Sequence, residues 1–190
     1  MELRDIINGI YALPEESLDK IVACTDFLSC KRGTFILEAG KVERDIFLIS
    51  SGIARAYVLS DGKEVTFWIG CEGSEIISLD SYVNGRAGYE TIELMEDSEL
   101  YRLRTGDLQR LFATDINIAN WGRKLAEQEF LRTEKRMIPL LSTTASARYE
   151  ALLKNSPELL RRIPLECLAT YLGITPVSLS RIRSKLKCFR

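Results

Sequence analysis

The sequence predicts an α+β protein in which a β-roll with flanking helices is followed by a long connecting helix and a C-terminal helix-turn-helix domain. Glycine-separated runs of β-branched and aromatic residues in 31–104 predict the roll. A helical apolar trace predicts the long helix at about 105–138, and two short amphipathic segments joined by Gly173 predict the helix-turn-helix. We therefore expect two domains, at residues 1–138 and 139–190.

The β-roll is predicted by the spacing of glycines and of strand-like runs. Eight of the twelve glycines lie between Gly33 and Gly88, where they separate runs rich in β-branched and aromatic residues. Asp61-Gly62 is the strongest short hairpin signal in the sequence. Short strands at regular spacing are typical of a closed or sandwich-like roll, whose apolar interior is large enough for a small ligand. The expected strands are residues 34–37, 46–50, 53–59, 65–69, 89–95 and 99–103.

Helices are expected on both sides of the roll. Residues 1 to about 30 have apolar residues at helical spacing, and Pro14 before two glutamates marks a helix start. The long helix after the roll carries more apolar surface than one small domain covers, which favours a dimerisation helix over the alternative that it packs on its own roll. Pro139 and the polar residues 142–144 are expected to form a hinge.

The residues from Ile163 to Lys187 are predicted to form the helix-turn-helix. Gly173 suits the left-handed turn, Thr175 is a suitable N-cap and Pro176 a suitable first helical residue. The buried residues are expected to be Leu165, Leu168, Ala169 and Leu172 of the first helix, and Leu179, Ile182 and Leu186 of the second. The opposite face of the second helix carries Val177, Ser178, Arg181, Ser184 and Lys185. The alternative is a small helical hairpin that packs on another element.

Charge is distributed unevenly along the chain. Residues 139–190 contain nine Lys/Arg and three Asp/Glu and so carry +6, whereas the remaining residues carry −7. Attraction to phosphate is needed only where a protein touches nucleic acid. A basic end joined to an acidic body therefore favours a nucleic-acid reader with a separate regulatory domain.

The composition argues against several other classes of protein. The chain has no histidine, which removes imidazole metal ligands and the common Ser-His-Asp and Cys-His arrangements, so we assign no catalytic residue and no metal ligand. The five cysteines lack a metal-ligand spacing and are expected to be free thiols. No apolar run approaches the roughly 18 residues of a membrane span, and we expect a cytoplasmic protein without a membrane partner.

Residues 37–67, LEAGKVERDIFLISSGIARAYVLSDGKEVTF, resemble cyclic nucleotide-binding domains. They contain a glycine turn, an acidic spacer, an Ile-Phe-Leu-Ile strand ending at Gly52, and a hairpin with Asp61-Gly62 at its tip. Together with the long helix and the helix-turn-helix, this order resembles the Crp/Fnr family of bacterial transcription regulators over nearly the whole chain. The C-terminal part is similar to the Bacteroidetes-type branch. The resemblance implies that the roll is a jelly-roll-like double-stranded β-helix acting as a sensor domain.

The resemblance further implies a homodimer on double-stranded DNA, with two recognition helices in successive major grooves of a near-palindromic operator. Matching the family's motif places Pro176, Val177, Ser178 and Arg181 at base-reading positions. Arg181 is the strongest candidate because a guanidinium can donate two hydrogen bonds to guanine, although a phosphate contact is the alternative. Val177 replaces the family's common acidic residue and would suit a thymine methyl. Thr175 and Lys185, with Ser178, Arg183 and Lys187, are expected to bind phosphate or form the rim. RNA polymerase is a further candidate partner.

The resemblance also predicts a degenerate sensor pocket. Nucleotide-binding members hold the ribose and cyclic phosphate with a Gly-Glu pair and an Arg-Ser or Arg-Thr pair. Here the first pair falls on Ile77-Ser78, and Arg86 is followed by Ala87. A cyclic phosphate would be desolvated without compensation, so we predict that cyclic AMP is not bound. No cofactor is predicted, and the effector is unknown.

The sequence therefore predicts a homodimeric, sequence-specific DNA-binding transcriptional regulator rather than an enzyme. The alternative is a small-molecule or protein-binding module that retains the fold without regulated DNA binding. The basic C-terminal end disfavours that alternative.

Overall fold

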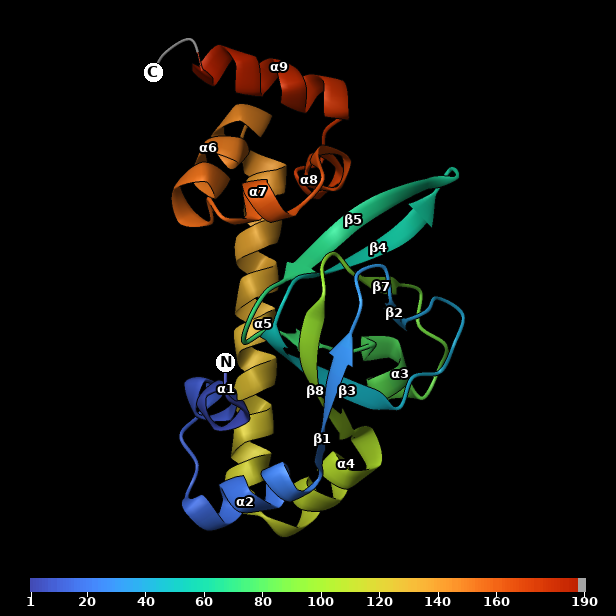
Figure 1. The fold of residues 1–190 in the computed structure, drawn as a ribbon, viewed down its shortest axis with the longest axis vertical. Helices are drawn as coiled ribbons and strands as arrows, with labels where there is room; N and C mark the ends of the chain where they lie inside the picture. The colour runs from blue at the N-terminus through green and yellow to red at the C-terminus, as the bar shows by residue number, and fades with distance from the viewer. Residues whose placement is uncertain (188–190) are drawn as a thin grey trace. The chain divides into compact units, whose positions relative to one another are not determined.

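The computed structural model in Figure 1 describes residues 1–187, and for Lys187 the backbone alone. Within these residues, eight strands form two four-stranded sheets, with the orders β1-β8-β3-β6 and β2-β7-β4-β5. β1 pairs with β8, and β8 with β3, in antiparallel register. This arrangement confirms the predicted jelly-roll-like roll. The strands are β1 Thr25–Cys30, β2 Phe35–Leu37, β3 Asp45–Ser51, β4 Ala54–Ser60, β5 Lys63–Gly70, β6 Glu75–Ile76, β7 Thr91–Leu94 and β8 Ser98–Arg104.

The helices flank and follow the roll. Two precede it, α1 Leu3–Ile10 and α2 Glu15–Ala23, and α3 Leu79–Asn84 lies between β6 and β7. Two more follow the roll, α4 Thr105–Thr114 and the 27-residue α5 Ile116–Ser142. The C-terminal helices are α6 Ala145–Asn155, α7 Leu159–Arg162, α8 Leu165–Tyr171 and α9 Pro176–Lys187.

The hairpin between β4 and β5 has the turn that its sequence predicts. Asp61 and Gly62 have φ values of 50° and 72°. Positive φ at both central residues defines a type I′ turn, whose twist matches that of the flanking strands.

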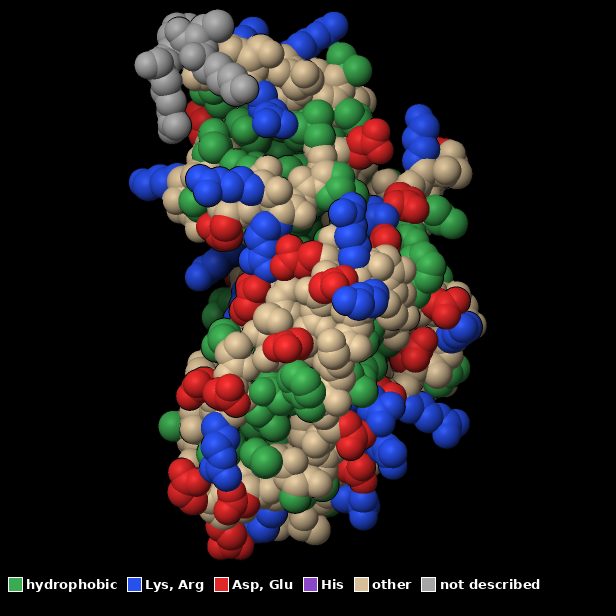
Figure 2. All heavy atoms as spheres, in the orientation of Figure 1, with side chains coloured by type: hydrophobic (Ala, Val, Ile, Leu, Met, Phe, Trp, Pro, Cys, Tyr) green, Lys and Arg blue, Asp and Glu red, His purple; other side chains and the backbone are tan. Residues whose placement is uncertain are grey.

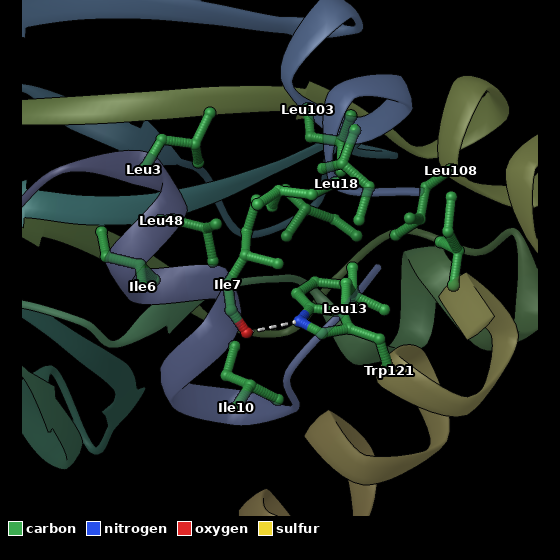
Figure 3. Close-up of a cluster of buried hydrophobic side chains, with 13 residues drawn as sticks. Leu3, Ile6, Ile7, Ile10, Leu13, Leu18, Leu48, Leu103, Leu108 and Trp121 are labelled. Carbon is green, nitrogen blue, oxygen red and sulfur yellow. Dashed lines mark hydrogen bonds between the residues drawn. The ribbon is translucent and has the colours of Figure 1, made fainter. Parts of the chain in front are cut away.

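The largest core cluster attaches the N-terminal helices to the roll (Figure 3). Leucine and isoleucine side chains of α1 and α2 pack there against Leu48 of β3, Leu103 of β8 and Trp121 of α5. The indole Nε1 of Trp121 donates a hydrogen bond to the carbonyl of Ile7 at 3.0 Å. The polar atom of this buried side chain is thereby satisfied, and α1 is fixed to α5.

The helical prediction for residues 1 to about 30 is wrong at its end, where Thr25–Cys30 forms β1. Thr25 pairs with Leu103 and Cys30 with Ser98, more than 65 residues away in sequence. A pairing partner so distant leaves no local signal in a short polar segment, so tertiary pairing decided this element.

The long helix expected from Thr105 is two helices, because the chain is extended at Asp115, with φ −137° and ψ 109°. The Oδ1 atom of Asp115 accepts hydrogen bonds from the amides of Asn117 (3.0 Å) and Ile118 (3.4 Å) and so caps α5. Ser17 and Lys20 of α2 donate to its Oδ2 atom. Burial by itself raises the pKa of Asp115, but these side-chain and amide hydrogen bonds outweigh burial and lower that pKa.

The break between α5 and α6 lies at Thr143 and Thr144, within the polar stretch 142–144 of the predicted hinge and not at Pro139. α5 continues through Pro139 to Ser142, and the carbonyl of Pro139 accepts from the amide of Thr143 at 3.0 Å. Thr144 then caps α6 by accepting from the amide of Ala147 at 3.2 Å. A proline prevents a hydrogen bond from its own nitrogen but does not by itself end a helix that is otherwise supported.

The chain divides into two compact units. The first comprises residues 1–56 and 69–130, which form most of the roll with its flanking helices. The second comprises residues 57–68 of the β4–β5 hairpin together with residues 131–190.

Candidate nucleic-acid interface

The helix-turn-helix of the second unit consists of α8, a tight turn and α9. Gly173 has φ +68° in this turn, the left-handed conformation that favours glycine. The amide of Ile174 donates to the carbonyl of Ala169 at 3.0 Å, which closes the end of α8. Ala169 of α8 and Leu179 of α9 are fully buried. A small residue on one helix and a leucine on the other thus form the core of the motif.

The N-terminus of α9 is capped as the sequence predicts. The Oγ1 atom of Thr175 accepts from the amide of Ser178 at 3.2 Å. The hydroxyls of Thr175 and Ser178 also form a hydrogen bond of 2.9 Å. Ser178 is half-buried, and its hydroxyl is committed to the cap. The structure therefore places the other predicted base-reading residues on the open face of α9 and Ser178 at its edge.

The open face of α9 runs along the whole helix. Val177 is 62% exposed, and Arg181 and Lys185 follow it at intervals of four residues, both exposed. Residues four apart lie on one face of a helix. Arg181 forms no hydrogen bond or ion pair with any residue in the described part of the chain. In Figure 2, Lys and Arg side chains extend over α9.

Two serines lie between these positions on the same face. Ser180 and Ser184 are exposed, and the Ser184 hydroxyl donates to the carbonyl of Ser180 at 3.1 Å. The prediction from sequence omitted Ser180 because serine at this position has no distinctive local signal. Its position beside Arg181 and one turn after Val177 could have identified it. Pro176 is also exposed at the start of this face, whereas Arg183 is half-buried.

In the first unit, the residues that the resemblance aligns with the nucleotide-binding pairs, Ser78 and Arg86, lie in different environments. Arg86 and Ala87 are exposed on the turn after α3. Ser78 is buried before α3, and its Oγ atom has no hydrogen-bond partner among the described residues. Ser78 is the residue that the resemblance aligns with the glutamate of the Gly-Glu pair, so the structure has a buried hydroxyl at that position.

The buried arginine of this unit is instead paired internally. Arg55 of β4 is 7% exposed, and its Nε and Nη2 atoms donate to Glu93 Oε2 of β7 at 3.2 and 2.8 Å. Glu90, beside β7, is also buried and accepts from the amide of Tyr89 at 3.1 Å. Because the Arg55 guanidinium is already hydrogen-bonded to Glu93, an anion would have to compete with that carboxylate for it.

Ser78 and Glu90 approach each other around Gly88. A Cβ atom at Gly88 would lie 2.4 Å from Ser78 Oγ and 3.2 Å from Glu90 Oε1. Only glycine fits this close approach. The backbone at Gly88 is therefore closely packed against these two polar side chains.

Metal binding and membrane insertion have no structural support in the described residues. Across residues 1–187, no three His, Cys, Asp or Glu side chains gather in an arrangement that could hold a metal ion. Cys24, Cys30, Cys71 and Cys167 form no disulfide with one another, and Cys188 lies outside the described residues. Among the described helices, none combines the length and the apolar character needed to cross a bilayer.

The comparisons with known proteins agree with this architecture. A family model described as the cyclic nucleotide-binding domain matches residues 27–115. A search of curated proteins gives no match.

Several solved structures share the fold over most of the chain. FixK2 from Bradyrhizobium japonicum has a TM-score of 0.73 at 20% identity, covering 86% of this chain and 85% of that chain. A putative transcriptional regulator of the Crp/Fnr family from Eubacterium rectale has a TM-score of 0.74 at 19% identity, covering 93% and 84%. The c-di-GMP responsive global regulator CLP of Xanthomonas campestris has a TM-score of 0.73 at 16% identity, covering 92% of both chains. Residues 27–115 are therefore similar to cyclic nucleotide-binding domains, and the chain as a whole shares the fold of these transcription regulators.

Proposed function

We propose that this protein is a homodimeric, sequence-specific DNA-binding transcriptional regulator. The observation that carries the proposal is the open face of α9, where Val177, Arg181 and Lys185 are exposed on a capped and well-packed helix. Pro176 and Ser180 extend this surface, and Ser178 and Thr175 lie at its N-terminal rim. The fold shared with transcription regulators supports the same role.

Base reading is assigned to two side chains of this face, and a phosphate contact to a third. Arg181 suits guanine, because its five donors form a planar fork and no described protein group occupies them. Val177 offers only apolar surface and suits a thymine methyl. Lys185 lies one turn beyond Arg181 and is placed on phosphate, where a point charge suffices.

Dimerisation is assigned to α5. Phe130, Met137 and Leu141 are separated by seven and four residues, which places them on one face of the helix. They are 73%, 50% and 81% exposed, and Leu131 and Ile138 beside them are 50% exposed. A stripe of this kind along one helix favours a second copy of α5 over packing on the chain's own roll. Two paired copies would present two recognition helices to a near-palindromic operator.

The sensor is proposed to be unable to bind cyclic AMP. Arg55 is paired with Glu93, Glu90 is buried, and Arg86 is exposed, so a cyclic phosphate would meet no available buried cation. We assign no effector and no cofactor. As a DNA-binding regulator the protein would act in the cytoplasm, where it would also meet RNA polymerase, and we propose no enzymatic activity.

Selection from a pool of random duplex DNA tests the proposed function. The full-length protein should enrich duplexes with two inverted half-sites centred about 10 bp apart. The enriched duplex should protect two successive major grooves in footprinting. A pool that remains random after selection would contradict the proposal and would favour the binding-module alternative.

A further inference from the structure

Three consecutive residues at the end of α8 are each held by a different part of the second unit. The carbonyls of Leu168, Ala169 and Thr170 accept from amides in the turn that follows α8. The carbonyls of Tyr171 and Leu172 accept no hydrogen bond from these amides, as expected for the last carbonyls of a helix. Side chains from other helices satisfy them instead.

Arg148 of α6 holds the carbonyl of Leu172. Its Nε and Nη2 atoms donate to that oxygen at 3.1 and 2.9 Å. Its Nη1 atom donates to the carbonyls of Thr143 at 2.6 Å and Pro139 at 3.3 Å. One guanidinium thus joins the C-terminal end of α5 to the residue that directly precedes Gly173 in the turn.

Arg136 of α5 holds the carbonyl of Tyr171. Its Nη2 atom donates to that oxygen at 3.2 Å, and its guanidinium carbon lies 4.4 Å from the centre of the Tyr171 ring. The contact combines a charge-assisted hydrogen bond with a cation–π interaction. α5 is therefore attached to α8 directly as well as through Arg148.

The β4–β5 hairpin holds Thr170. The amide of Thr66 in β5 donates to Thr170 Oγ1 at 3.1 Å, and that hydroxyl in turn donates to the carbonyl of Cys167 at 3.2 Å. Thr66 is 1% exposed. Hairpin, long helix and α6 thus converge on residues 170–172, which we term the α8 junction.

We propose that the α8 junction positions the recognition helix, with Arg148 as its principal positioning residue. The turn after Leu172 leads directly into α9, so the orientation of α9 relative to α5 depends on where residues 170–172 are held. In a dimer built on α5, the two junctions fix the separation of the two recognition helices. Arg148 acts through Leu172 and does not itself touch DNA.

The inference rests on the proposed DNA-binding function, and half-site spacing provides a specific test. Duplexes carry the selected operator with its natural spacing, or with one base pair inserted or removed between half-sites. A lysine at position 148 keeps the charge but lacks the planar fork that reaches both α5 and α8. We expect Arg148→Lys to weaken binding to the operator with natural spacing about tenfold. The further loss of affinity caused by inserting or removing one base pair should be smaller than in the wild type. Binding to a single half-site should not change.

Two further variants and one stability measurement keep the test interpretable. Arg161→Lys changes an exposed arginine of α7 outside the α8 junction and should behave as wild type. Thermal unfolding checks that each variant is folded. Arg136→Lys provides a second junction variant if Arg148→Lys is unstable, and it should also relax the spacing preference.

The outcomes separate the inference from the proposed function. The inference would be overturned if the Arg148→Lys and Arg136→Lys variants were folded and lost as much affinity on altered spacing as the wild type does. Equal losses on operator and half-site, with the slope of log affinity against log salt reduced by about 0.9, would instead make Arg148 a phosphate contact and would also overturn it. If the wild-type protein enriched no operator, the proposed function would fail first.

Discussion

The charged groups on the open face of α9 are exposed and, within the described residues, unpaired, whereas those in the interior of the roll are buried and paired. Arg181 and Lys185 are exposed and form no ion pair within the described residues, whereas Arg55 is buried against Glu93. An unpaired exposed guanidinium remains available for a partner at little desolvation cost, because it is already in water. A buried guanidinium bound to a carboxylate can accept another anion only if the existing pair breaks. The comparison shows that the cations of the open α9 face are available to a partner, whereas the buried cation of the roll is not.

The largest effect is expected from separating the two recognition faces. The double substitution Met137→Asp and Leu141→Asp places charges on the exposed apolar stripe of α5. The dimer should dissociate, and affinity for the two-half-site operator should fall about 100-fold or more, because bivalent binding is lost. Sedimentation velocity and gel shift measure the two quantities. Lys135→Asp, at a polar position of the same helix, is the control and should remain dimeric.

Arg181→Ala should have the next largest effect. Removing a bidentate contact to guanine should cost about 1 to 3 kcal/mol on the operator and should relax the base preference at one position of each half-site. Lys185→Ala is the matched comparison and should weaken operator and scrambled duplex equally. If Arg181→Ala also reduced the affinities for the operator and for the scrambled duplex by the same factor, Arg181 would be a phosphate contact.

Gly88→Ala tests the closed interior of the roll. The new methyl group would lie 2.4 Å from Ser78 Oγ, so we expect a loss of about 1 to 3 kcal/mol in the free energy of unfolding. Denaturant titration measures the loss. Adding Ser78→Ala removes the nearest clashing atom and should restore part of the stability. An unchanged stability in the single variant would show that this region has free space.

The cap of α5 predicts a smaller effect that depends on pH. Hydrogen bonds lower the pKa of Asp115 in the folded protein, so its ionised form stabilises the fold above the unfolded pKa of about 3.9. That contribution is lost as pH falls through the lower folded pKa. Asp115→Asn should lose stability at neutral pH, and the difference from wild type should shrink below about pH 4. Thermal unfolding between pH 3 and 7 would reveal a constant difference if the cap were unimportant.

The last prediction is that cyclic AMP does not bind to the protein. Calorimetric titration of the protein with cyclic AMP is expected to give no heat of binding, because the buried cation is already paired. Binding of cyclic AMP in the micromolar range would contradict the proposal that the roll has no available buried cation for a cyclic phosphate.

Local chemistry determined which parts of the fold could be predicted from sequence. The α9 start was predictable because Thr175 and Pro176 mark it independently, and the turn because Gly173 tolerates a positive φ. The hairpin at Asp61-Gly62 was predictable for the same reason. These signals act within a few residues and do not depend on the rest of the chain.

The features that were missed depend on distant partners. β1 forms because it pairs with β8, and α5 starts at Ile116 because Ser17 and Lys20 reach Asp115 from α2. The α8 junction was not anticipated, since Arg148 is one of many arginines until α5 and α8 are placed beside it. At the candidate site, Ser178 was expected to face outward, but its hydroxyl bonds Thr175. Within one turn of an N-cap, hydrogen bonding to the capping residue determines which face of the helix a side chain lies on.

The most direct test of the central claim is the ratio of affinities for the selected operator and a scrambled duplex, measured by gel shift at several salt concentrations. A sequence-specific regulator should bind the operator at least about 1,000-fold more tightly than the scrambled duplex, and both affinities should fall as salt increases. Equal affinities, or binding that does not change with salt, would contradict a role in sequence-specific DNA recognition.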